Sequence, residues 1–156
     1  KIYNREVDVN LYGGKWIKKV ACRAMKKYFE NYQQRMINVI NKYPMFRAPG
    51  TFAHLEHLAM DYVGAGNKMG EGWLLTGEML ELINDGVNNI VCTQPFGCLP
   101  NHIVGKGMIR KIKDDYPESN IVAIDYDPGA TRINQENRIK LMLANTGKMK
   151  QFVKAE

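Results

Sequence analysis

Two short apolar segments rich in β-branched residues, NIVC at 89–92 and NIVAID at 120–125, constrain the fold more than any other feature of the sequence. Between them lies a helical pattern that Pro100 starts and that Pro117 ends. Two strands joined through a helix are typical of a βαβ unit, in which the strands are parallel and the crossover is right-handed. The sequence therefore predicts an α/β fold: a Rossmann-like small parallel sheet flanked by helices, with a helical N-terminal segment.

Helical periodicity predicts the elements around this unit. From Lys15 to Tyr43 apolar residues recur every four positions, which indicates one long helix whose other half is basic. Further helices are expected over 52–63, from Glu71 to Gly86, and from 131 to a stop near Gly147. We expect the first helices and the closing helix to pack on the faces of the sheet. The stripe of the long helix consists of Trp16, Val20, Ala24, Tyr28, Tyr32, Met36 and Ile40.

The expected organisation is a helical lead-in over residues 1–50, dominated by the long helix, and an α/β domain over 51–156. The 156 residues are 45% hydrophobic and 24% charged, and no stretch approaches the roughly 18 apolar residues of a membrane span. We therefore expect no membrane as partner. The net charge of +6 comes without a nucleic-acid-binding motif, so we expect no nucleic acid either. Three cysteines without a dense pattern, and no secretory leader, favour the cytoplasm.

The segment CTQPFGC places two cysteines around a turn after the first predicted strand. Because ligands bind at the carboxyl ends of parallel strands, we expect Cys92, Cys98, Asp125 and Asp127 to share one rim. Cys98 also precedes a helix start, where free amide donors favour a thiolate. Two thiolates do not fill the four ligand positions of zinc or of a cluster, so further ligands must come from outside this chain or from His102 and the aspartates.

Other motifs carry less chemistry. Four glycines in VGAGNKMGEG, residues 63–72, indicate an unusual backbone or a close approach to a ligand, and the spacing is not that of a dinucleotide fingerprint. His54, His57 and Asp61 lack the spacing of a metalloprotease zinc site, and a solvated helix face is the favoured interpretation. DPGAT at 127–131 imitates a phosphate turn of actin-like ATPases, but a polar helix is expected after it. Further residues that would line the site are Glu71, Gly72, Gln94 and Gly97.

Two segments carry a resemblance to a known family. CTQPFGCLPNHIVGKGMIRKIKDDYPESNIVAIDYDPGATRINQENRIKLMLAN and GEGWLLTGEMLELI resemble the C-terminal part of the long activase proteins related to the activators of 2-hydroxyacyl-CoA dehydratases and benzoyl-CoA reductases. The resemblance covers about residues 50–146. It implies ATP-driven transfer of a low-potential electron to a partner dehydratase or reductase. In the relatives, cysteines at strand ends ligate a four-iron cluster, so the resemblance implies Cys92 and Cys98 as ligands.

The resemblance also implies which parts lie elsewhere. Upstream cysteine motifs and the actin-like ATPase unit are absent from this chain, so ATP would bind only outside it, and the 4Fe–4S cluster of the full-length protein would be incomplete here. No complete active site is expected. Three functions stay open: an electron-transfer module, a structural domain that docks the ATPase region against a partner, and an acyl-CoA-binding domain whose basic helix attracts phosphate. Homo-oligomerisation also stays open.

Overall fold

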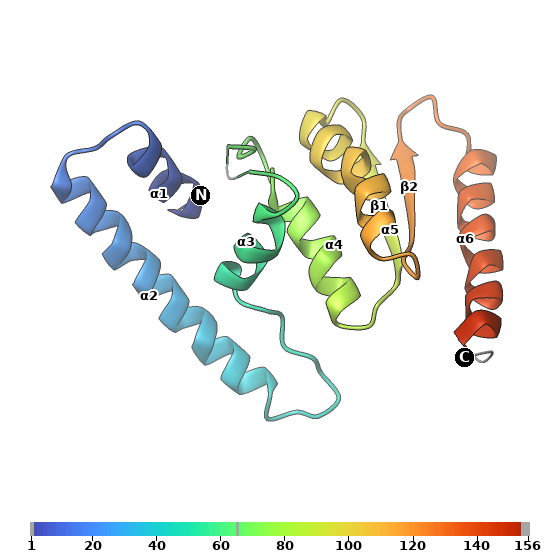
Figure 1. Cartoon of the computed structure of the whole chain (residues 1–156), viewed down its shortest axis with the longest axis horizontal. Helices are drawn as coiled ribbons and strands as arrows, with labels where there is room; N and C mark the ends of the chain where they lie inside the picture. Colours follow the sequence, from blue (N-terminus) through green and yellow to red (C-terminus); the bar gives the residue numbers. More distant parts are fainter. Residues whose placement is uncertain (1, 65, 154–156) are drawn as a thin grey trace. The chain divides into compact units, whose positions relative to one another are not determined.

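The computed structural model describes residues 2–64 and 66–153. The chain divides into two compact units, Lys1–His57 and Leu58–Glu156, and the division falls inside α3 (Phe52–Met60) (Figure 1). No helix in the described ranges combines the length and the apolar character needed to cross a bilayer.

The first unit is built on two helices ahead of α3. α1 (Ile2–Leu11) and α2 (Trp16–Ile40) are joined by a turn in which Gly13 has a φ of 72°. The long helix expected from Lys15 is confirmed, with an end three residues earlier than expected. α1 was not expected as a separate helix, because ten residues are fewer than the window in which helical periodicity is recognised.

Polar side chains make the contacts between α1 and α2. The Nζ of Lys26 lies 2.9 Å from Oε2 of Glu6 and 4.3 Å from the ring centre of Tyr3. The Tyr3 hydroxyl donates a hydrogen bond of 2.8 Å to Glu30. Partial burial and the Glu30 carboxylate raise the pKa of Tyr3 well above its usual range. The face of α2 that contacts α1 is therefore the charged one.

Apart from Ile40, which is partly buried, the apolar stripe of α2 is exposed. No residue of α2 is buried. Periodicity thus identified the helix, but not the face that it uses inside the first unit. The large apolar side chains of α2 that are 53–72% exposed are Trp16, Ile17, Val20, Met25, Tyr28, Phe29, Tyr32, Met36 and Val39.

The second unit contains the predicted parallel strand pair. β1 (Asn89–Pro95) and β2 (Asn120–Tyr126) pair in register, from Asn89 with Asn120 to Pro95 with Tyr126. α4 (Leu74–Asn84) precedes them and α6 (Arg132–Val153) follows. This is a mixed α/β unit with a two-stranded parallel sheet.

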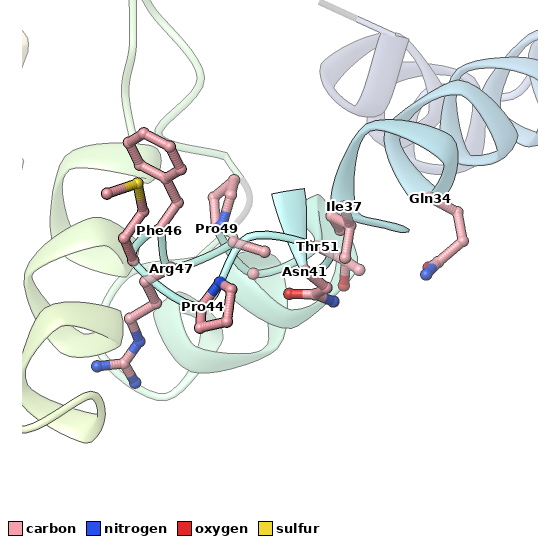
Figure 2. Close-up of a pocket in the computed structure, with 11 residues that line it drawn as sticks. Gln34, Ile37, Asn41, Pro44, Phe46, Arg47, Pro49 and Thr51 are labelled. Atoms are coloured by element: carbon pink, nitrogen blue, oxygen red, sulfur yellow. The ribbon is translucent and has the colours of Figure 1, made fainter. Parts of the chain in front are cut away.

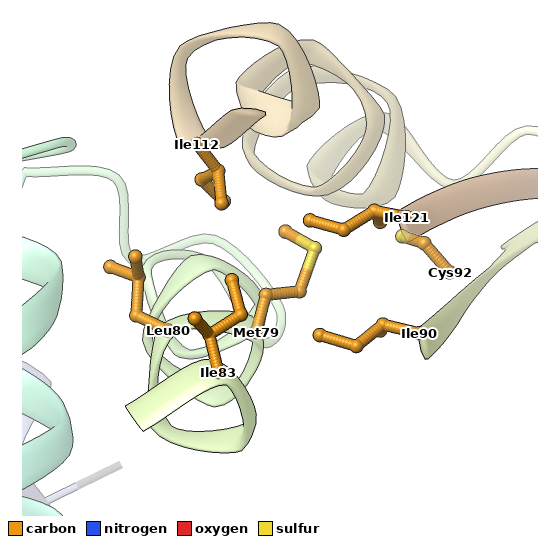
Figure 3. Packing of buried hydrophobic residues seen from close by; sticks show 7 residues of the cluster. All are labelled: Met79, Leu80, Ile83, Ile90, Cys92, Ile112 and Ile121. Carbon is orange, nitrogen blue, oxygen red and sulfur yellow. The ribbon is translucent and has the colours of Figure 1, made fainter. Parts of the chain in front are cut away.

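One face of the sheet carries the core. Side chains from α4, both strands and α5 (Ile109–Asp115) meet there (Figure 3). Ile112 is completely buried, and Leu80 is 1% exposed. Since burial alternates along β1, Ile90, Cys92 and Gln94 all point to this face. The buried cluster consists of Met79, Leu80, Ile83, Ile90, Cys92, Ile112 and Ile121.

α6 closes the other side of β2. Nη1 of Arg138 donates to the carbonyl of Ala123 at 2.7 Å, and Nε2 of Gln135 donates to that of Asp125 at 3.2 Å. Successive carbonyls of a strand point to opposite edges, so the carbonyls of Ala123 and Asp125 point to the same edge of β2. The carbonyl of Tyr126 points to the other edge, where it accepts the N–H of Phe96 after β1. The helix therefore satisfies strand groups that β1 does not reach. Contrary to the sequence expectation, α6 continues through Gly147, because a glycine weakens a helix without forbidding it.

The connection between the strands departs from the single helix expected after Pro100. It begins with a π-helical turn, η1 (Asn101–Gly105), continues with a 3₁₀ turn, η2 (Lys106–Met108), and ends in α5. A Cβ on Gly107 would lie 3.2 Å from the carbonyl of His102. Such wide turns are rare and cluster at functional sites.

Candidate functional site

A tight turn carries the chain from β1 to Cys98. The N–H of Cys98 donates to the carbonyl of Pro95 at 3.1 Å, and Gly97 at the third position of the turn has a φ of 68°. A type II turn requires positive φ at that position, which explains the glycine. Gly97 therefore has a local backbone role, and the partly exposed Cys98 follows directly.

The sulfur of Cys98 has a side-chain donor. Nδ2 of Asn101 lies 3.1 Å from Sγ of Cys98, and Asn101 is 5% exposed. The N–H of His102 instead bonds to the carbonyl of Cys98. The donor to the sulfur is thus a buried carboxamide, where we expected a backbone amide of a helix start. Asn101 was missed in the sequence, although a polar residue directly after Pro100 was its signal.

Cys92 lies in a different environment. It is in the middle of β1, 8% exposed, and part of the core cluster (Figure 3). Burial raises the pKa of its thiol, and a hydrogen bond from Nε2 of Gln94, at 3.0 Å, opposes the rise. The strand runs three residues beyond the expected end, so Cys92 faces the core and does not emerge at the rim.

Gln94 and Gly105 connect the two cysteine environments. Gln94 is 1% exposed, and its Oε1 is buried without a hydrogen-bond partner among the described residues. A Cβ on Gly105 would lie 3.4 Å from Sγ of Cys92, 3.6 Å from Nε2 of Gln94 and 3.7 Å from Oδ1 of Asn101. The glycine thus lets the π-helical turn approach β1 closely. We call Cys92, Gln94, Cys98 and Asn101, grouped around Gly105, the thiol–amide cluster.

The other expected site residues have local partners. The carboxylate of Asp125 lies 3.3 Å from Nζ of Lys106 and 3.7 Å from a guanidinium nitrogen of Arg138. Oδ1 of Asp127 accepts the N–H of Gly129 at 2.7 Å. His102 is exposed. Within residues 2–64 and 66–153, no three His, Cys, Asp or Glu side chains are grouped so that they could hold a metal ion.

The glycine-rich segment reaches the start of the π-helical turn. A Cβ on Gly70 would lie 3.3 Å from Cγ of Pro100, and Gly70 and Gly72 have φ values of 61° and 55°. The segment therefore packs beside the residue that links Cys98 to Asn101. Glu71, between the two glycines, is exposed.

Hollows in the described residues also lie away from Cys92 and Cys98. One of about 330 Å³ borders the end of β2 and α6, and its lining includes Asp125, Asn134 and Arg138. Another of about 630 Å³ lies in the first unit between the end of α2 and the loop that follows it. In Figure 2, Gln34 and Ile37 come from α2, Asn41 directly follows its end, and Pro44, Phe46, Arg47 and Pro49 come from the loop.

Replacing Glu78 with glutamine is expected to stabilise the second unit at neutral pH. Desolvation, Glu71 and Glu81 together raise the pKa of Glu78. A carboxyl whose pKa is higher in the folded chain favours folding when protonated and opposes it when ionised. Thermal unfolding should therefore show Glu78→Gln with the higher midpoint at pH 7, and the gap should close as the pH falls to about 4, near the pKa of unfolded glutamate. An unchanged gap across this range would contradict the assignment.

Comparisons of the chain with protein-family models, with curated proteins and with solved structures find no match.

Proposed function

We propose that this chain is the C-terminal module of an activase system for acyl-CoA dehydratases or reductases. In this role it contributes thiol ligands to an iron–sulfur site for ATP-driven, low-potential electron transfer. Its partner is a cytoplasmic dehydratase or reductase protein, and ATP is bound outside this chain. The resemblance over residues 50–146 supports the proposal, as does the arrangement of β1 and β2, which suits a Rossmann-like sheet.

The observation that carries the proposal is the hydrogen bond from Asn101 to the sulfur of Cys98. Hydrogen bonds to cluster sulfurs adjust the reduction potential of an iron–sulfur centre, and they fix the orientation of the ligand. Cys98 is partly exposed and directly follows the turn at the end of β1, which suits a ligand to a cluster that other residues also hold. We therefore assign Cys98 as the principal ligand.

Cys92 is the second candidate ligand. Its buried thiol holds its proton more strongly than a free cysteine does. A bound metal deprotonates a coordinating thiol outright, so a raised pKa of the free thiol is compatible with ligation. A Cβ on Gly105 would lie 3.4 Å from Sγ of Cys92, so the π-helical turn packs directly against this sulfur.

The ligand set of this chain is half of what a four-iron cluster requires. Such clusters are held by four cysteine thiolates, and the thiol–amide cluster supplies two thiols. In this proposal the remaining ligands come from outside the thiol–amide cluster.

A structural scaffold is the second candidate function, and the burial of Cys92 in the core cluster favours it. Free cysteines often act as small buried hydrophobes. In that case the second unit holds other parts of the system together and binds no iron.

Iron and acid-labile sulfide, measured anaerobically on the full-length protein, distinguish the two functions. We expect Cys98→Ser to lose most of the iron, and Cys92→Ser to lose part of it or all of it. Cys22→Ser is the matched control, because Cys22 is partly exposed in the first unit, outside the thiol–amide cluster. Iron that persists in Cys98→Ser would refute the assignment of Cys98 as a ligand. If the unchanged protein itself contains no iron, the scaffold function is the one that remains.

A further inference from the structure

α2 presents a narrow apolar seam. Its members alternate at spacings of three and four residues, which is the a and d pattern of three heptads. At about 100° per residue, they lie within about 100° of arc on the helix. All except Cys22 are more than half exposed. The seam, here called the α2 seam, consists of Cys22, Met25, Phe29, Tyr32, Met36, Val39 and Tyr43, the last just beyond the end of α2.

The first unit uses another side of the same helix. Lys26 and Glu30 contact α1, and Nε2 of Gln33 donates to the carbonyl of Gly50 at 3.3 Å. On a helical wheel, these three residues lie about 70° to 130° from the middle of the seam. The polar side of α2 therefore makes these contacts within its own unit, whereas the seam residues from Met25 to Tyr43 stay more than half exposed. Contiguous exposed apolar surface of this kind marks a binding surface.

The seam is shaped to receive side chains. Its aromatic rings form a cluster with Tyr28, whose ring centre lies 5.5 Å from that of Phe29 and 6.1 Å from that of Tyr32. Beside the seam is a hollow of about 300 Å³. A helix packed on a seam inserts side chains into such hollows, and tyrosine, phenylalanine and methionine are enriched at the centres of protein interfaces. The lining includes Phe29, Tyr32, Met36, Ile40, Pro49 and Phe52.

The charge on the helix selects the kind of partner. α2 carries six Lys and Arg side chains and one acidic side chain, Glu30, which already accepts the Tyr3 hydroxyl. Two copies of α2 packed along the seam would bring basic helices together, which is unfavourable. An acidic helix would instead place carboxylates opposite Arg35, beside the seam, and opposite Lys18, in line with its N-terminal end.

We propose that the α2 seam binds an acidic amphipathic helix of a partner protein. A basic amphipathic helix also suits an anionic membrane surface, but that role uses a broad apolar face. Trp16, Ile17 and Val20 broaden the exposed apolar face only near the start of α2. From Met25 to Tyr43 the heptad spacing and the tyrosine hydroxyls fit a helix better. The proposal is independent of the iron–sulfur site, which lies in the second unit.

A designed peptide tests the proposal on the full chain. The probe is a labelled four-heptad helix with leucine at a and d and glutamate at e and g, and its control has lysine at e and g. Fluorescence anisotropy should show binding of the acidic peptide only. Phe29→Glu and Met36→Glu should each weaken this binding at least about tenfold, as expected for central interface residues. Asn31→Glu makes the same change of charge on the opposite, polar side of α2 and should bind as the unchanged chain does.

Four outcomes would overturn the proposal. The first is no binding of the acidic peptide, and the second is equal binding of both peptides. The third is a dimer in sedimentation experiments that Phe29→Glu dissociates, because the seam then binds a second copy. The fourth is association with phosphatidylcholine–phosphatidylserine vesicles that Phe29→Glu abolishes while peptide binding is unaffected, which would assign the seam to a membrane surface. Circular dichroism of each variant verifies that the helices are retained.

Discussion

Replacing Gly72 with alanine is expected to unfold the second unit at temperatures where the unchanged chain is folded. Gly72 has a φ of 55°, and a Cβ there would lie 2.1 Å from the carbonyl oxygen of Asn67. The same oxygen accepts the N–H of Trp73, whose side chain is 2% exposed. Because backbone atoms cannot yield as a flexible side chain can, the loop must rearrange. We expect a loss of about 3 kcal/mol or more, from backbone strain and steric overlap together.

Thermal unfolding followed by circular dichroism measures this loss. For a unit of this size, the midpoint should fall by more than about 10 °C. Gly64→Ala is the matched control in the same segment, because its Cβ would meet no atom within 4 Å and its φ lies outside the left-handed region. Equal midpoints for the two variants would mean that the carbonyl of Asn67 does not lie beside Gly72 as described.

The glycine-rich segment also shows how far the sequence leads. Four glycines in VGAGNKMGEG predict unusual backbone conformation, and Gly70 and Gly72 do have positive φ. The same pattern left open whether a ligand or the protein itself approaches the glycine. The structure shows an approach of the protein itself, since the carbonyl of Asn67 occupies the space beside Gly72. A contact between backbone atoms has no signature in residue type, so the pattern could not identify it.

The parallel strands were predictable because their signals are local. β-branched runs mark β1 and β2, and Pro100 and Pro117 mark the ends of the connection. The π-helical turn was not predictable, because it depends on the approach of Gly105 to Cys92, thirteen residues earlier. Such a contact is set by packing between elements, which no local propensity encodes.

The two cysteines illustrate the same distinction at the site. The turn before Cys98 was recognisable from its glycine and proline, and Cys98 does follow it. The environment of Cys92 depends on where β1 ends, because the alternation that places Ile90 and Gln94 in the interior also places Cys92 there. Because the strand was expected to end at Cys92, the alternation of burial was not used to place its side chain. The two cysteines consequently differ in exposure and in the side chain that donates to the sulfur, although the sequence presents them as a matched pair.

The sequence predicted the helix that carries the α2 seam, but not the position of the seam on it. The recurrence of apolar residues every four positions predicted the helix, and the basic residues of the other half were also noted. A four-residue spacing drifts around the helix by about 40° at each step, whereas alternation of three and four keeps to one side. The seam from Met25 to Tyr43 follows the second rule. Which side α1 occupies became known only from the contacts of Lys26 and Glu30.

Replacing Ile112 with alanine should cost about 3 kcal/mol of the free energy of unfolding, within the range measured for large-to-small changes in protein cores. Ile112 is completely buried, and it joins α5 to the core cluster between α4 and the strands (Figure 3). The loss has two parts. The removed methyl and methylene groups no longer contribute the free energy of their burial, and a cavity remains because the neighbouring side chains relax only in part.

Ile103→Ala removes the same atoms from the same connection and is the matched control. Ile103 is 59% exposed in η1, so its replacement should change stability by less than about 0.5 kcal/mol. Urea denaturation should show a lower midpoint for Ile112→Ala at an unchanged slope, because a smaller side chain alters stability and leaves the surface exposed on unfolding nearly the same. Equal midpoints for the two variants would mean that α5 does not anchor the connection. The position of η1, and with it the pairing of Asn101 with Cys98, would then depend on contacts other than those of the core.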